Sequence, residues 1–133
     1  MNITKVEGIG SVYAEKLVAV GITTTNALLK AGKTAKARKE LAEKTDISPK
    51  LILEWINHAD LFRIKGVGGE YADLLEAAGV DTVPELAQRN AANLYSKMAE
   101  VNAAKNLVRR VPPQSNVEQW VAQAKELPRV IEY

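Results

Sequence analysis

A short pattern built around two glycines occurs twice in this chain, 58 residues apart. Residues 6–14 read VEGIGSVYA, and residues 64–72 read IKGVGGEYA. When residues 6–29 are aligned with 64–87, nine of 24 positions are identical, among them both glycines of the pattern. A period near 60 residues that keeps its glycines indicates a duplicated structural unit.

The duplication divides the 133 residues into two repeats of about 60, at 1–63 and 64–133. A chain of this length forms one domain or two small units that share a core. We expect the two repeats to pack together as one compact unit.

Helical signals dominate both repeats, and strand signals are nearly absent. Gly21 and Gly79 stand where a helix ends, and Ser48 and Pro49 stand where one begins. We expect an all-α fold with a loosely held tail after Pro128. The expected helices cover residues 12–20, 24–31, 35–44, 49–60 and 69–78, and further helices begin at Thr82, Asn90, Asn102 and Ser115.

Aromatic residues recur at matching places of the two repeats. Trp55 and Trp120 lie at inward helical positions, so we interpret both as core anchors. Tyr13 and Tyr71 follow the second glycine of each pattern by three residues, and packing is favoured over stacking on bases. The one histidine, His58, is expected at the boundary or on the surface.

The paired glycines suggest contact with an anion. The glycines allow a positive φ or a close backbone approach, and the aliphatic residue between them can point into the core. A helix that begins at Ser11 offers free N–H groups and the positive end of its dipole beside Gly10. Such an arrangement can bind a phosphate.

Both copies of the pattern resemble the helix-hairpin-helix family, in which an aliphatic residue stands between two glycines and alanine and leucine follow. From Ile3 to Tyr133 the chain resembles a small bacterial family of unknown function with paired helix-hairpin-helix repeats. The resemblance implies a SAM-like multihelical bundle. The matching residues are Gly8, Ile9, Gly10, Ala14 and Leu17 in the first copy, and Gly66, Val67, Gly68, Ala72 and Leu75 in the second.

In helix-hairpin-helix proteins the hairpin N–H groups hold a DNA phosphate, and flanking basic side chains hold the next, without reading bases. The resemblance therefore implies weak, sequence-independent binding of the DNA backbone. The implied contacts are Gly8, Ile9, Gly10, Ser11 and Lys16, together with Lys65, Gly66, Val67, Gly68 and Gly69. A secondary basic patch comprises Lys30, Lys33, Lys36, Arg38 and Lys39.

The charge of the chain is unfavourable for DNA binding, most of all at the second copy of the pattern. The whole chain has a net charge of only +2, whereas nucleic-acid binders usually carry a stronger basic excess. Glu70 and Asp73 follow the second glycine pair and would repel a phosphate, while Glu7 stands beside the first. Loss of DNA binding, with the helices serving as a protein-interaction scaffold, is the alternative.

Two further segments are read as hairpins that have lost their glycines. Residues 41–50 carry Asp46 and Ser48 where glycines belong, and residues 101–105 are the more altered counterpart in the second repeat.

The sequence predicts neither catalysis nor a metal or other cofactor. It has no cysteine, and its single histidine has no partners at metal-ligand or triad spacing. It has no apolar run near the roughly 18 residues of a transmembrane helix. We therefore expect a cytoplasmic protein whose partner is double-stranded DNA or another protein, with its oligomeric state open.

Overall fold

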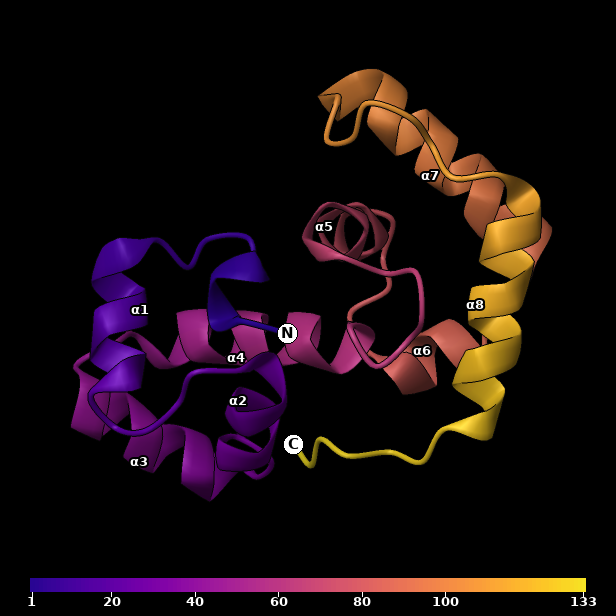
Figure 1. Cartoon of the computed structure of the whole chain (residues 1–133). Coiled ribbons are helices and arrows are strands. Elements are labelled where there is room, and N and C mark those ends of the chain that lie inside the picture. Colours follow the sequence, from indigo (N-terminus) through magenta and orange to yellow (C-terminus); the bar gives the residue numbers. More distant parts are fainter. The chain divides into compact units, whose positions relative to one another are not determined.

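A computed structural model describes all residues from 1 to 133 and consists of helices joined by short connections (Figure 1). The all-α class expected from the sequence is confirmed, and no helix has the length and apolarity of a transmembrane span. The elements are η1 (Ile3–Lys5), α1 (Ser11–Val18), α2 (Thr25–Ala31), α3 (Ala35–Thr45), α4 (Pro49–Leu61), α5 (Gly69–Ala77), α6 (Val83–Ala87), α7 (Ala91–Lys105) and α8 (Gln114–Glu126).

Local capping explains where several helices begin. The side chains of Thr24 and Thr34 accept hydrogen bonds from the third residue of α2 and of α3, and Asn90 does the same for α7. Such caps satisfy one of the N–H groups that a helix start leaves without a partner. The five helices whose ranges were expected from the sequence begin and end within two residues of those ranges.

The chain forms two compact units, and the last residues belong to the first of them. Unit 1 comprises Met1–Asp60 and Val130–Tyr133, and unit 2 comprises Leu61–Arg129. The packing of two repeats into one compact unit stays a prediction.

The end of the chain is ordered against unit 1, so the expectation of a loosely held tail is wrong. Ile131 is buried, and the backbone N–H of Glu132 donates to the Lys33 carbonyl at 2.8 Å. The Tyr133 hydroxyl donates to Oδ1 of Asn57 at 3.0 Å. One apolar side chain and two hydrogen bonds thus hold the segment beside the α2–α3 connection, where Figure 1 draws the C-terminus.

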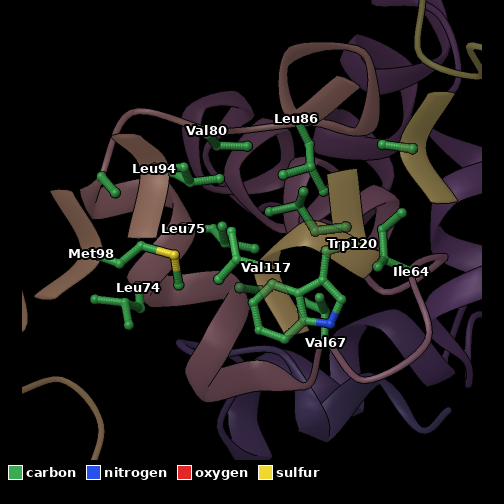
Figure 2. Close-up of a cluster of buried hydrophobic side chains, with 14 of the residues drawn as sticks. Ile64, Val67, Leu74, Leu75, Val80, Leu86, Leu94, Met98, Val117 and Trp120 are labelled. Carbon is green, nitrogen blue, oxygen red and sulfur yellow. The ribbon is translucent and has the colours of Figure 1, made fainter. Parts of the chain in front are cut away.

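Unit 2 is built around one apolar cluster in which α8 packs against α6 and α7, and α7 against α5. Figure 2 shows the Trp120 indole within this cluster, beside Ile64, Val67 and Val117. Trp120 and its counterpart Trp55 are both almost fully buried, which confirms their expected role as core anchors.

The sequence expectation of a helix start at Asn102 is wrong. Asn102 lies inside α7, which continues to Lys105 and ends at Asn106 in the left-handed region. The Asn102 side chain both accepts from the backbone N–H of Val108 at 2.9 Å and donates to its carbonyl at 3.0 Å. Residues 101–105 are therefore helical rather than an altered hairpin, and Asn102 holds the connection that follows.

The first glycine of each pair is required by the fold. Gly8 and Gly66 have φ values of 96° and 95°, where side chains with a Cβ are strained. A Cβ at Gly8 would lie 3.3 Å from Nε1 of Trp55, and one at Gly66 would lie 3.0 Å from Nε1 of Trp120. Each tryptophan therefore packs directly on a turn that only glycine fits.

We expect Gly66→Ala to lower the free energy of unfolding by about 1–3 kcal/mol, because it forces a positive φ on a residue with a Cβ and crowds the Trp120 indole. The matched control is Gly68→Ala, at an ordinary φ of −104° with no atom within 4 Å of the added Cβ. Urea denaturation followed by tryptophan fluorescence measures both. Equal losses for the two variants would contradict this assignment.

Candidate nucleic-acid interface

Each hairpin leads directly into a helix whose first N–H groups have no side-chain cap. We call residues 8–10 the first hairpin and residues 66–68 the second hairpin. Gly10 and Gly68 are the N-cap residues of α1 and α5, and neither helix start has a side-chain hydrogen bond. The first intrahelical bonds run from Ala14 to Gly10 and from Ala72 to Gly68, at 2.9 and 2.8 Å. The N–H groups ahead of Ala14 and Ala72 are therefore available to a ligand.

The second glycine of each pair has no evident structural reason to be glycine. Gly10 has φ −86° and ψ −174°, and Gly68 has φ −104° and ψ −171°, both in extended regions open to any residue. A Cβ at either position would meet no atom within 4 Å. Serine, aspartate or asparagine would also cap the helix better than glycine. The open space at this position is what close approach of a ligand to the backbone requires.

Charged side chains support the first hairpin only weakly. Lys5 and Glu7 are both exposed just before it, so their charges oppose each other. Lys16 lies in the last turn of α1, at the far end from Gly10, and its Nζ is 3.5 Å from the carbonyl of Asp46. The structure therefore does not bring Lys16 to the hairpin, contrary to the contact set that the resemblance implied.

The second hairpin is hydrogen-bonded to α8 and is followed by an acidic residue in α5. The Gln123 amide accepts from the backbone N–H of Lys65 at 2.9 Å and donates to its carbonyl at 3.3 Å. Glu70 is exposed in the first turn of α5, the turn whose N–H groups have no side-chain cap. A carboxylate in this turn is stabilised by the positive end of the helix dipole, and it repels a phosphate.

The tyrosines that follow the hairpins pack on the core tryptophans. The rings of Tyr13 and Trp55 meet edge to face with centroids 5.0 Å apart, and those of Tyr71 and Trp120 are 5.4 Å apart. The packing role favoured from the sequence is confirmed. His58, by contrast, is only 4% exposed, so its expected place at the boundary or surface is wrong.

The basic patch divides into four exposed lysines and one buried arginine. Arg38 is 7% exposed, and its guanidinium donates to the carbonyls of Gly32, Lys33 and Glu132 at 2.9, 3.3 and 3.0 Å. It also lies over the Tyr133 ring, 5.6 Å from the centroid. Arg38 thus fastens the end of the chain to the α2–α3 connection and is not presented to a partner. The exposed residues Lys30, Lys33, Lys36 and Lys39 are what we call the lysine surface.

The lysine surface and the first hairpin lie on different sides of unit 1. The first hairpin packs on Trp55 of α4, whereas Gly32 of the α2–α3 connection packs on Ile56 with no room for a Cβ. Adjacent residues of a helix point about 100° apart. Figure 1 accordingly draws the turn before α1 and the α2–α3 connection on opposite sides of α4. The lysines therefore do not supply charge to the hairpin.

Unit 1 also contains two open clefts beside α3. One, of about 170 Å³, is lined by apolar residues that include Val20, Ile22 and Leu41, together with the charged residues Glu40 and Lys44. The other, of about 420 Å³, lies at the α3–α4 connection and includes Asp46, Ile47 and Ser48. This connection repeats the hairpin plan, with a positive φ of 56° at Asp46 and a buried Ile47 ahead of the helix start.

The comparison with protein families gives one match, which covers most of the chain. Residues 7–127 match the family described as Domain of unknown function (DUF4332). The chain belongs to this family. No curated protein and no solved structure matches it significantly. Membership carries no assigned activity, so inferences about function rest on the hairpins and their surroundings.

Two contacts of this region had no clear signal in the sequence. Arg38 stands in a run of exposed lysines, and nothing in that run marks it as the side chain that turns inward. Gln123 occupies an ordinary position in a helix, and its side-chain amide bonds to the backbone of Lys65, 58 residues earlier. The absence of a metal or cofactor stays a prediction.

We expect Arg38→Met to lower the free energy of unfolding by about 1–3 kcal/mol, because it removes the buried hydrogen bond to the Gly32 carbonyl and the bonds to the Lys33 and Glu132 carbonyls. Lys39→Met, at the neighbouring exposed position, is the control and should change stability by no more than about 0.5 kcal/mol. Thermal denaturation followed by circular dichroism measures both. An unchanged Tm for Arg38→Met would contradict the structural role of the guanidinium.

Proposed function

We propose that this is a non-enzymatic protein in which each unit carries a helix-hairpin-helix motif, and that the first hairpin binds the DNA backbone weakly and without sequence preference. The N–H groups at the start of α1 would hold one phosphate oxygen each, assisted by the positive end of the helix dipole. No base edge is contacted, so the interaction carries no sequence information.

The observation that carries this proposal is the second glycine. Gly8 is explained by its positive φ and by Trp55, but Gly10 has an ordinary conformation and open space around it. Gly68 has the same properties in unit 2. A glycine that the fold does not need, in front of unpaired N–H groups, is what close contact between backbone and phosphate requires.

One residue distinguishes the two hairpins as candidate sites. Val12 of α1 is 65% exposed and uncharged, and the residue at the same place in α5 is Glu70. A phosphate approaching α1 therefore meets no carboxylate in the first turn, while one approaching α5 does. We assign the DNA contact to the first hairpin and a structural role to the second.

The proposed affinity is low because few cations accompany the hairpin. Non-specific DNA binding draws its strength from counterions released by several lysine and arginine contacts. Near the first hairpin only Lys5 is available, and Glu7 opposes it. The dominant attraction at this hairpin then comes from its N–H groups.

The test exchanges Val12 for the residue that the second unit carries. Val12→Glu should lower duplex affinity at least tenfold at about 50 mM salt, where electrostatic binding is strong, without lowering Tm, because an acid in the first turn of a helix is stabilising. Val12→Gln is the uncharged control and should bind like the wild type. Fluorescence anisotropy with a labelled duplex measures the affinities.

The protein-interaction scaffold remains the competing function, favoured by the cleft at Val20, Ile22 and Leu41. The same experiment separates the two. If the wild type binds no duplex at about 50 mM salt, or if Val12→Glu binds as well as Val12→Gln, hairpin-mediated DNA binding is wrong and the scaffold is the better reading.

A further inference from the structure

We infer that the lysine surface is a second, separate binding surface for the nucleic-acid backbone, so that one chain can hold two duplex segments at once. The lysine surface is argued from its own residues, while the joining of two duplexes rests on the proposed function of the first hairpin. Three features of unit 1 support it.

The first feature is that the four lysines have no partners. The side chains of Lys30, Lys33, Lys36 and Lys39 are exposed, and none makes a hydrogen bond or ion pair within the chain. No acidic residue occurs between Ala27 and Lys39. Four neighbouring cations that no carboxylate pairs with directly repel one another, and an anionic polymer relieves that repulsion.

The second feature is that one of the lysines stands where a helix disfavours positive charge. Lys36 is the second residue of α3, Lys39 follows one turn later, and the first turn contains no acid. The N-terminal end of a helix carries a partial positive charge that acids stabilise and lysines oppose. The positive potential here is therefore built at a cost to helix stability, which is understandable if the surface binds an anion.

The third feature is that hydrogen bonds fix the backbone that carries the surface. Arg38 binds the carbonyls of Gly32 and Lys33, and the Lys33 carbonyl also accepts from the N–H of Glu132. The connection that carries Lys33 and leads into Lys36 is thereby fixed. The backbone that carries these lysines need not be ordered by the ligand, which removes part of the entropic cost of binding.

Acidic residues near the surface reduce its positive charge and limit its extent. Glu40 and Glu43 each follow a lysine of the surface, Lys36 or Lys39, by four residues on α3, so they lie on the same exposed side of the helix. Glu132 lies beside Lys33. All three are exposed, and none pairs with a lysine of the surface. The positive region is thus confined to the end of α2, the connection and the start of α3.

A duplex on the first hairpin and a duplex on the lysine surface would approach unit 1 from different sides, because these surfaces flank different faces of α4. We therefore expect a separate duplex at each surface, and the chain then acts as a link between them.

The binding experiment uses the full chain and a labelled duplex, and it isolates the lysine surface with Val12→Glu. That variant should retain binding at least tenfold weaker than that of the wild type, with a log–log salt dependence whose slope is about −3 to −4, from four contacts at roughly 0.9 each. Adding Lys36→Glu and Lys39→Glu should lower the remaining affinity at least tenfold. Lys36→Glu should not lower Tm, since acids suit the start of a helix, and the Tm of the double variant is measured to check that it is folded.

Lys50→Glu is the matched control, because Lys50 is likewise an exposed second residue of a helix in unit 1. Added to Val12→Glu, it should leave affinity within about twofold, as expected for a charge outside the contact. If it weakens binding as much as a lysine-surface substitution does, or if Lys36→Glu with Lys39→Glu leaves binding unchanged, the lysine surface is overturned. Binding of anionic lipid vesicles in place of duplex would also overturn it.

The joining of two duplexes is tested by capture. A duplex fixed to beads should retain a second, fluorescent duplex only when wild-type protein is added, and Val12→Glu or Lys36→Glu with Lys39→Glu should each abolish capture. If wild-type protein binds duplex but captures no second one, the link is overturned. If only the lysine substitutions reduce binding, the hairpin function fails and the lysine surface stands alone.

Discussion

The contact between a buried indole and a glycine in the left-handed region is the constraint on which both units depend. In each unit a tryptophan lies against a turn that has no room for a side chain, with Trp55 at Gly8 and Trp120 at Gly66. The ring of the tyrosine in the following helix packs against the same indole. The helix start after the turn is thereby fixed in place, and its first N–H groups have no side-chain cap.

The two glycines of each hairpin have different physical roles. The first is needed by the backbone and by the indole, so its recurrence is explained by folding. The second has an ordinary conformation and open surroundings, and its recurrence is not explained in that way. Gly10 and Gly68, rather than the hairpin as a whole, are therefore the residues that point to a function. The neighbouring residues, Val12 and Glu70, then decide between the two sites.

Much of the local structure could be predicted from the sequence, because caps, periodicity and recurring glycines act over a few residues. Thr24 and Asn90 were expected to begin helices, and both do. Contacts made by long polar side chains over large sequence distances could not be predicted. Arg38 reaches a carbonyl 94 residues away, and Gln123 reaches the backbone of Lys65, 58 residues earlier. Both side chains look like surface residues in a periodic pattern, and only the folded chain reveals their partners.

The most direct test of hairpin binding observes the backbone N–H groups themselves. In a titration of isotope-labelled protein with duplex DNA at about 50 mM salt, the amide resonances of Ser11, Val12 and Tyr13 should shift, while those of Gly69, Glu70 and Tyr71 should not. Absence of shifts at Ser11–Tyr13, or equal shifts at both helix starts, would contradict the assignment of the phosphate contact to the first hairpin.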